Sequence, residues 1–321
     1  MAINLKALKP HKVSRDLSGY ITYIYGPGGA GKTTFGSQMP DPLLIAFERG
    51  YNALPGVIAQ DVTSWAEMKQ VLRQLNDPEV KETFKSIVID TVDIAAQLCE
   101  KYVCSQLNIE NIGDGGWKTN GWAKVKKEWE TTFRDIAMKG YAVVFISHAK
   151  EKTIKKEDGT EYNVIVPSCT PVYNEIIKNM VDLEGYISIN QDERKLVLRS
   201  NGFIECKSRF AHIAPVIPFS YQSLADALNK AIDDEAADTS NKFITEEREQ
   251  LAGVTAYDFD ALMAEFKEMA STLMGKSQDY GPKITAIIEK HLGKGKKIGD
   301  ATIAQAEVIA VINGEIKDTL M

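Results

Sequence analysis

YITYIYGPGGAGKTT, residues 20–34, is the stretch of this sequence that decides its fold. The β-branched and aromatic residues at 20–25 predict a buried strand. They run directly into GPGGAGKT at 26–33, which matches the pattern G-x-x-x-x-G-K-[ST], and the following TTFGSQM favours the start of a helix. A glycine-rich turn can match this pattern by chance. The order strand, loop, helix is the context that a phosphate-binding loop requires, and it favours the functional interpretation.

The predicted loop has the chemistry to hold a triphosphate. Glycines allow successive backbone N–H groups to point inward, and the adjoining helix adds the positive end of its dipole. We expect Lys32 to contact the β- and γ-phosphates and the Thr33 hydroxyl to coordinate Mg²⁺. The sequence therefore predicts binding of ATP with Mg²⁺ by Gly26, Pro27, Gly28, Gly29, Ala30, Gly31, Lys32, Thr33 and Thr34.

An acidic residue closes the next buried strand. Asp90 ends the run SIVID, where a carboxylate at the edge of a parallel sheet can hold Mg²⁺ through water. Asp93 competes for this role, but it falls inside the following helix and suits a charge at the helix N-terminus better. We predict that Asp90 is the magnesium-binding carboxylate.

Two further polar residues follow strands at the same predicted edge. Glu48 follows LLIAF, where it can polarise a water that attacks the γ-phosphate, and His148 follows YAVVFIS, where it can sense that phosphate. On position alone, a solvated loop charge and a structural histidine are open alternatives.

Strands alternate with helices and are then followed by a run of strands, which indicates an α/β fold. We expect a mostly parallel central sheet extended by antiparallel strands. A hairpin is predicted at Thr153–Val166, because Asp158-Gly159 supports a tight turn. The late strands are expected at Leu183–Ile189, Lys195–Arg199 and Phe203–Lys207.

The chain divides into four predicted regions. An N-terminal extension (1–19) precedes the ATPase core (20–220). A helix and acidic linker (221–255) follow, with DDEAADTSN at 233–241 marking the linker. A small helical domain (256–321) ends the chain.

Composition excludes several classes of protein. The 321 residues carry a net charge of −6, so any contact with nucleic acid must come from local lysines rather than the global field. The four cysteines lack the spacing of a zinc site or disulfide framework. No apolar run reaches the roughly 18 residues of a membrane span, and the N-terminus lacks a signal peptide. We expect a cytoplasmic protein with no membrane contact.

Four short motifs carry a family resemblance: FERG at 47–50, IVID at 87–90, ISHAKEK at 146–152 and ECKSRF at 205–210. Over about residues 18–220 the chain resembles RecA-like P-loop ATPases, and within them the phage nucleotide-binding proteins of the Sak type, which are associated with single-strand annealing. The resemblance implies that Glu48 is the catalytic carboxylate. It also implies that His148 stands where RecA proteins place a phosphate-sensing glutamine.

Lys207 and Arg209 form a K-x-R pair predicted to share one face of a strand. By resemblance, such a pair reaches the nucleotide of a neighbouring subunit, which implies a homo-oligomeric ring or filament. Ordinary strand-surface charges are the alternative.

Two segments correspond in order to the DNA-binding loops of RecA. Asn108–Gly121 offers Trp117 and Lys118, an aromatic ring for stacking beside a cation. The hairpin offers Lys150, Lys152, Lys155 and Lys156 among four acidic residues, so a solvated hairpin is an alternative. A denser lysine cluster at 290–297 suits a second contact or a solvated helix end.

The leading hypothesis is an ATP-dependent protein that binds single-stranded DNA and promotes annealing, acting in the bacterial host cytoplasm if phage-encoded. A single-stranded-DNA-binding protein or replication protein is a candidate partner for the C-terminal domain. The alternative is an ATPase switch, similar to a helicase loader, that acts on a replication protein. A nucleotide kinase is disfavoured because no arginine-rich lid precedes Asp90.

Overall fold

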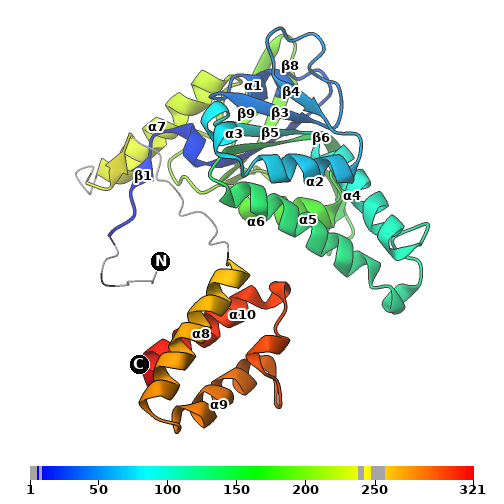
Figure 1. Ribbon diagram of the computed structural model, residues 1–321. Coiled ribbons are helices and arrows are strands. Elements are labelled where there is room, and N and C mark those ends of the chain that lie inside the picture. Colours follow the sequence, from blue (N-terminus) through cyan, green and yellow to red (C-terminus); the bar gives the residue numbers. More distant parts are fainter. Residues whose placement is uncertain (1–5, 7–8, 238–241, 247–256) are drawn as a thin grey trace. The chain divides into compact units, whose positions relative to one another are not determined.

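The computed structural model describes residues 6, 9–237, 242–246 and 257–321 (Figure 1). The chain forms two compact units, Met1–Gly253 and Val254–Met321, and each is described by itself below. The end of the predicted linker, including its junction with the helical domain at 255/256, lies outside the described residues.

A ten-stranded sheet of described residues forms the centre of the first unit. Six of the strands are joined to one another by parallel pairing, and the other four pair in antiparallel orientation, as the sequence predicts. The main path runs β11 (Val216–Pro218), β9 (Glu193–Val197), β8 (Leu183–Asn190), β2 (Ile21–Gly26), β6 (Ala142–Lys155), β5 (Ser86–Asp90), β3 (Pro42–Ala46) and β4 (Ala59–Asp61). Beside this path, β7 (Glu161–Pro167) pairs with β6, and β10 (Lys207–Ser208) pairs with β8. A separate parallel pair joins β1 (Val13–Ser14) to β12 (Ile244–Thr245).

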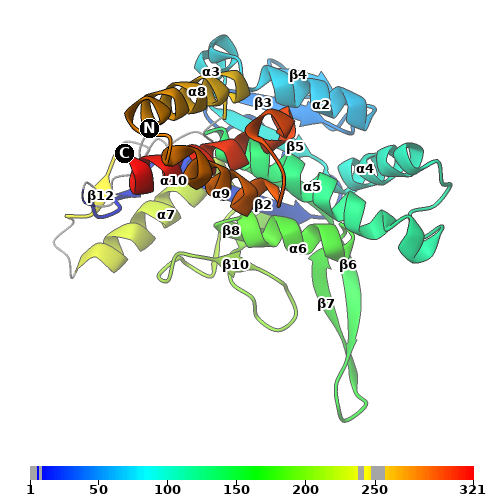
Figure 2. The same cartoon turned by 60° about the horizontal axis from the view of Figure 1, so that its bottom comes forward.

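Helices cover both faces of the sheet (Figures 1 and 2). Alternate strand residues point to opposite faces, so Tyr23 packs in one hydrophobic cluster and Ile24 in the other. The first cluster is closed by α2 (Trp65–Gln74), α4 (Val92–Leu107), α5 (Gly121–Met138) and α6 (Pro171–Met180). The second is closed by α1 (Lys32–Ser37) and α7 (Tyr221–Ala236), while α3 (Pro78–Thr83) leads into β5.

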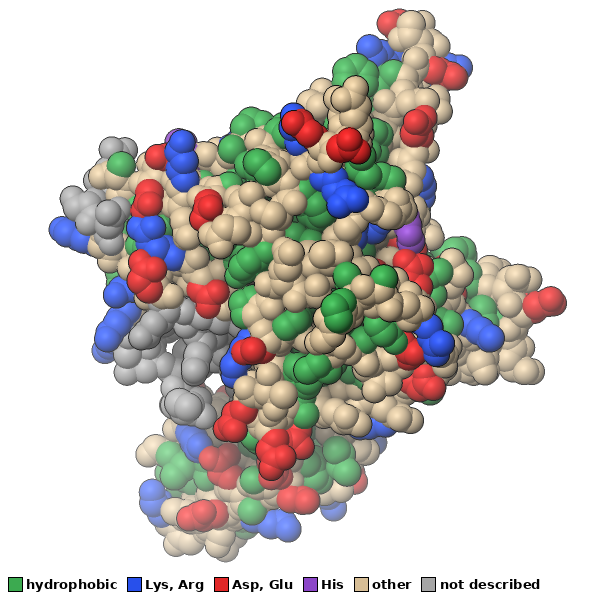
Figure 3. Space-filling model, turned by 90° about the horizontal axis from the view of Figure 1, so that it is seen from above, with side chains coloured by type: hydrophobic (Ala, Val, Ile, Leu, Met, Phe, Trp, Pro, Cys, Tyr) green, Lys and Arg blue, Asp and Glu red, His purple; other side chains and the backbone are tan. Residues whose placement is uncertain are grey.

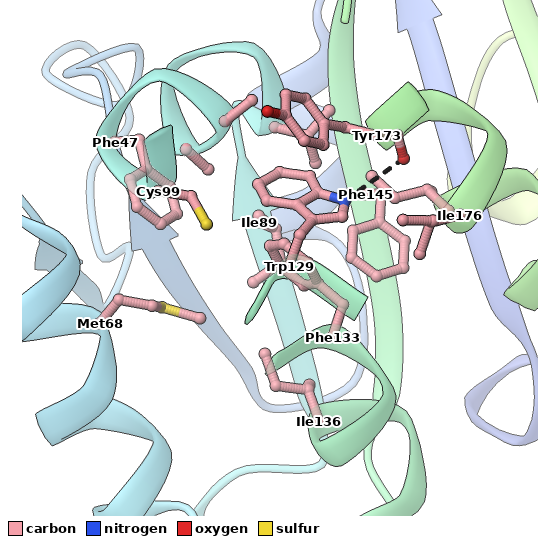
Figure 4. Packing of buried hydrophobic residues seen from close by; sticks show 14 of the residues in the cluster. Phe47, Met68, Ile89, Cys99, Trp129, Phe133, Ile136, Phe145, Tyr173 and Ile176 are labelled. Atoms are coloured by element: carbon pink, nitrogen blue, oxygen red, sulfur yellow. Dashed lines mark hydrogen bonds between the residues drawn. The ribbon is translucent and has the colours of Figure 1, made fainter. Parts of the chain in front are cut away.

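Aromatic rings fill the first cluster. The indoles of Trp65 and Trp129 stack with centroids 5.9 Å apart, and Phe133 meets Trp129 edge to face at 4.4 Å. The indole N–H of Trp129 donates to the Tyr173 carbonyl over 3.3 Å, as Figure 4 shows. This bond satisfies a buried donor, so the α5–α6 contact has no unpaired indole N–H.

The sequence prediction is wrong at Phe203–Lys207. Only Lys207–Ser208 forms a strand, and Ile204 makes an isolated bridge to Ile165. The Asn201 side chain accepts the N–H groups of Phe203 and Ile204 and holds them in a turn. This local bonding competes with a sheet ladder.

Two other boundaries differ from the prediction. The strand at 141–146 and the predicted hairpin are one feature, because β6 runs without a break into the ribbon that it forms with β7. Helix α7 continues to Ala236, so the first acidic residues of the predicted linker are helical.

The second unit consists, in its described part, of α8 (Phe259–Lys276), α9 (Tyr280–Leu292) and α10 (Ala306–Leu320). Leu273, Ile312 and Ile316 are fully buried among them. Lys290, from the predicted lysine cluster, pairs with Glu315 over 2.7 Å. None of the described helices, in either unit, has the length and apolar character needed to cross a membrane.

Candidate nucleotide-binding site

Strand register brings the predicted phosphate-site residues to one edge of the sheet. Gly26 at the end of β2 lies opposite His148 on β6, and Asp90 at the end of β5 lies between Ala46 on β3 and Ile146 on β6. Carboxyl ends of parallel strands thus converge here, the usual place for a ligand in an open α/β sheet.

The P-loop needs its glycines for physical reasons. Gly31 has φ of 94°, a conformation that side chains other than glycine rarely adopt. A Cβ on Gly26 would lie 3.0 Å from the Cβ of Ile187 on the adjacent strand. The loop is therefore shaped by a left-handed residue at one end and close strand packing at the other.

Lys32 is folded back onto the loop. Its ammonium donates to the carbonyls of Gly26 over 3.0 Å and Pro27 over 2.8 Å, and its side chain is buried. Burial lowers the pKa of Lys32. The Lys32 ammonium thus lies beside the loop and has already lost most of its hydration in the folded protein. An arriving phosphate therefore gains a strong, charge-assisted hydrogen-bond partner.

Asp90 and Thr33 are in direct contact. The Thr33 hydroxyl donates to Asp90 Oδ2 over 2.6 Å, and Asp90 is almost completely buried. Burial raises the pKa of Asp90 to about 6. Gly50, which the sequence analysis missed, completes this corner: a Cβ there would lie 2.9 Å from Thr33 Oγ1. The glycine that ends the FERG motif was the available signal.

The donor set fits Mg²⁺. One hydroxyl and one carboxylate converge at Thr33 and Asp90, and oxygen ligands are those Mg²⁺ prefers. The described residues contain no group of three or more His, Cys, Asp or Glu side chains placed to hold a metal by themselves. This suits an ion that keeps waters and binds together with substrate phosphates.

Glu48 and His148 meet at the same edge. The distance from His148 Nε2 to Glu48 Oε1 is 3.6 Å, and both side chains are more than one third exposed. The backbone N–H of Glu48 donates to the Asp90 carbonyl over 3.3 Å, which ties the loop after β3 to β5. A carboxylate and an imidazole therefore face the solvent beside the P-loop.

Asp93 lies in the first turn of α4, as predicted, and it also accepts several hydrogen bonds from other segments. It accepts hydrogen bonds from the His148 backbone N–H at 2.9 Å and from the hydroxyls of Ser147 at 2.9 Å and Ser168 at 2.6 Å. Its Oδ2 also lies 3.4 Å from His148 Nδ1. Asp93 thus fixes the segment that carries His148, a role that sequence position alone did not reveal.

The K-x-R pair lies away from its own P-loop. Arg209 pairs with Asp182 over 2.9 Å, and Asp182 also accepts the N–H of Ile21, the first residue of β2. Five residues at about 3.3 Å each, roughly 17 Å, separate that end of β2 from the P-loop. Lys207 donates to the Lys178 carbonyl in the last turn of α6. Arg209 falls outside β10, so the expected sharing of one strand face is wrong there.

The candidate DNA-binding residues occupy two exposed places. Trp117 is 87% exposed in the short helix η3 (Gly116–Lys118), with Lys118 beside it. The lysines of the hairpin are exposed on the ribbon of β6 and β7, which projects from the first unit in Figure 2. Both groups remain candidates for a contact with DNA.

The hairpin separates its charges by face. Alternation along β6 puts Lys150, Lys152 and Ile154 on one face, with Tyr162 opposite Ile154. Glu151, Thr153 and Lys155 occupy the other, where Asn163 bonds to both Glu151 and Thr153. The four lysines therefore do not share a face. Lys156, in the turn, lies 5.2 Å from the centroid of Tyr162.

The chain is similar to one family of known proteins, to one prophage protein and to one solved structure. A family model described as an AAA domain matches residues 18–210. An SPbeta prophage-derived uncharacterized protein, YorG of Bacillus subtilis strain 168, is 32% identical over 333 residues, which cover 100% of this chain and 99% of that protein. A crystal structure of the RadB recombinase aligns with a TM-score of 0.36 at 13% identity, covering 64% of this chain and 90% of that one.

Proposed function

The chain belongs to the AAA-domain family of P-loop NTPases, and from this premise we propose that it is a phage-type ATPase that binds single-stranded DNA and promotes annealing or strand pairing. The phage assignment is supported by the prophage origin stated for its full-length relative. The observation that carries the ATPase proposal is the convergence of Lys32, Asp90, Glu48 and His148 at one sheet edge.

The proposed reaction is hydrolysis of the bond between the β- and γ-phosphates. Glu48 accepts a proton from a water whose oxygen attacks the γ-phosphorus, and the bond to the β-phosphate oxygen breaks. Lys32 neutralises charge on the phosphates, while Thr33 and Asp90 would hold Mg²⁺, which supplies further charge stabilisation when bound. His148, positioned by Asp93, reports the presence of the γ-phosphate.

One strand joins this site to a candidate DNA surface. β6 carries His148 at the phosphate edge and continues without a break to Lys155. Seven residues at about 3.3 Å each span roughly 23 Å. A displacement of His148 on hydrolysis is therefore transmitted along a single hydrogen-bonded ribbon.

We assign the DNA contact to the face of the hairpin that carries Lys150, Lys152, Lys156, Ile154 and Tyr162. It combines cations with an aromatic ring, the combination that binds single strands without sequence preference. Acidic Glu151 and Glu161 are on the opposite face. On the molecular face shown in Figure 3, acidic and basic side chains of the described residues are interspersed, which suits a local contact.

Matched double variants test this assignment. Lys152→Ala with Tyr162→Ala is expected to weaken binding of a fluorescent oligothymidylate about tenfold or more, because stacking and phosphate contacts are each worth about 1 kcal/mol or more. Lys155→Ala with Thr153→Ala changes the opposite face and serves as control. Equal weakening by both variants, or no DNA binding by the wild-type protein with any nucleotide, would exclude this surface.

We further propose that Lys207 and Arg209 act on the nucleotide of an adjoining subunit, in a ring or filament. Their distance from their own P-loop supports this, and Arg209 remains 54% exposed despite its pairing with Asp182. Mixtures of Arg209→Ala and Glu48→Gln subunits, each inactive alone, are expected to regain ATP turnover. Mixtures that stay inactive at every ratio would contradict a shared site.

The net charge of −6 favours a second candidate, an ATPase switch that acts on a replication protein. It predicts that turnover rises with a host replication protein and is unchanged by oligothymidylate. The two candidates are separated by measuring ATP turnover with each addition alone.

A further inference from the structure

A small cleft adjoins the P-loop on the side of β2 where β8 and β9 lie. The strands next to Glu48 and His148, β3 and β6, lie on the other side of β2. The cleft has a volume of about 220 Å³, and its lining includes Gly31, Phe35, Gln38, Arg194, Phe219 and Ser220. Pockets for whole ligands usually measure about 300–1,000 Å³, so this cleft suits one part of a ligand. Its floor is the P-loop and α1, so a molecule in it is continuous with the phosphate site.

Two side chains from the antiparallel extension of the sheet reach over the loop. Arg194 lies on β9, next to the turn from β8, and Phe219 directly follows β11. At the position of a Cβ on Gly31, Phe219 Cε1 is 3.7 Å away and Arg194 Nη1 is 3.9 Å away. The backbone N–H of Phe219 donates to the Arg194 carbonyl over 3.0 Å, so the two residues are held together.

The chemistry of the cleft is that of a flat, weakly polar ring. Phe35 stacks on Phe219 with centroids 5.3 Å apart and planes at 21°, which fixes the Phe219 ring, and both rings line the cleft. Arg194 has no acidic partner among the ion pairs of the described residues, and its guanidinium is exposed. A planar cation beside an aromatic ring binds an aromatic ligand by stacking and cation–π attraction.

A polar group is also placed to meet such a ligand. Gln38 Oε1 accepts the backbone N–H of Tyr221 over 3.4 Å, which orients the amide and leaves its NH₂ group as a donor at the cleft. The Ser220 hydroxyl is already engaged with Ser223. The cleft therefore offers a donor for a ring nitrogen or carbonyl oxygen.

We propose that this cleft holds the nucleobase of the bound triphosphate, with Arg194 and Phe219 as its stacking residues and Gln38 as a donor to the base edge. This inference rests on the proposed nucleotide binding at the P-loop. If so, the antiparallel strands β9 and β11, and not the parallel strands alone, make the protein prefer a nucleotide to bare triphosphate.

The test compares two probes on the same protein. AMP-PNP with Mg²⁺ carries a base, and inorganic tripolyphosphate with Mg²⁺ does not, and both are measured by calorimetry or by competition. Arg194→Ala is expected to weaken AMP-PNP about tenfold, because such a contact is worth about 1.4 kcal/mol, and to leave tripolyphosphate unchanged. Lys195→Ala, on the same strand and paired with Glu193, is the matched control.

Each outcome decides between the two proposals. Equal loss for both probes would make Arg194 a phosphate ligand and overturn the base cleft, as would no loss for either. Absence of AMP-PNP binding by the wild-type protein would contradict the proposed nucleotide site itself. As a second measurement, photolabelling with 2-azido-ATP should modify the peptides that contain Arg194 or Phe219. Labels found only on other segments would also overturn the cleft.

Discussion

Charged side chains gather in two regions of the first unit, and they are compensated to different degrees. At the phosphate edge, defined by Gly26–Thr33, Glu48, Asp90 and His148, Asp90 is buried against a neutral hydroxyl. Among the described residues, the hydrogen-bond partners of the Lys32 ammonium there are backbone carbonyls. At the opposite end of β2, which we call the Asp182 region, Arg209 and Lys178 already have carboxylate partners within the chain.

The difference shows which region is built for a ligand. Among the described residues Lys32 and Asp90 form no salt bridge, so they gain from an anion and a cation that arrive together at the glycine loop, whereas paired charges gain little. Glu184 is the exception in the Asp182 region. It is fully buried, neither carboxylate oxygen makes a hydrogen bond within the described structure, and Lys178 Nζ lies 3.6 Å away.

The largest effect is expected at the phosphate edge. Glu48→Gln should bind ATP normally and lower kcat about a thousandfold, because it removes a general base whose contribution is typically about 10²–10⁴. A phosphate-release assay measures kcat, and calorimetry measures the affinity for ATP separately. Arg49→Ala is the neighbouring control, since Arg49 pairs with Asp61 on the next strand. Undiminished turnover in Glu48→Gln would exclude the carboxylate.

The next largest effect is expected on protein stability and concerns Glu184, the buried carboxyl of the Asp182 region. Burial raises the pKa of Glu184 from 4.5 to about 7. A carboxyl with a raised folded-state pKa binds its proton more tightly when folded. The contribution of Glu184 to stability is therefore largest below about pH 4.5 and is lost as the pH rises to about 7. The shift corresponds to about 3 kcal/mol in order of magnitude.

Glu184→Gln should remove most of this dependence. The variant is expected to be more stable than the wild-type protein at pH 8 and to differ little at pH 4.5, by urea unfolding. Glu193→Gln, an exposed carboxyl, is the control and should track the wild-type protein. An equal difference at both pH values would show that the buried carboxyl does not titrate in this range.

Lys32→Ala should weaken ATP binding about a hundredfold, because a charge-assisted hydrogen bond to phosphate is worth about 1.5–3 kcal/mol. The variant should retain the fold, since Lys32 makes only two bonds to loop carbonyls. Calorimetry and thermal unfolding check both statements, with exposed Lys85→Ala as control. Unchanged ATP affinity in Lys32→Ala would place the phosphates elsewhere.

Sequence reasoning succeeded where spacing fixes geometry. The P-loop context and runs of strand and helix predicted a mostly parallel α/β sheet with antiparallel strands and a helical C-terminal region, and the structure confirms this. It placed Glu48, Asp90 and His148 at one edge of the sheet, although His148 lies within β6 and does not follow it, and the roles of the three residues stay predictions. It failed where side chains act across the sequence: Asp93 meets Ser168, Gly50 meets Thr33, and Arg194 reaches Gly31. No local pattern encodes those approaches.

Arg209 is expected to give the smallest effect on stability. The Arg209 side chain in its ion pair with Asp182 is 54% exposed, and pairs with an exposed member are worth about 0–1 kcal/mol, so Arg209→Ala should lower the free energy of unfolding by less than about 1 kcal/mol. Asp182→Ala should cost more, because Asp182 also accepts the Ile21 N–H at the start of β2. Urea unfolding of both variants measures this. If Arg209→Ala matched Asp182→Ala, the guanidinium would be a structural member of the Asp182 region and unsuited to leave its partner for a neighbouring subunit.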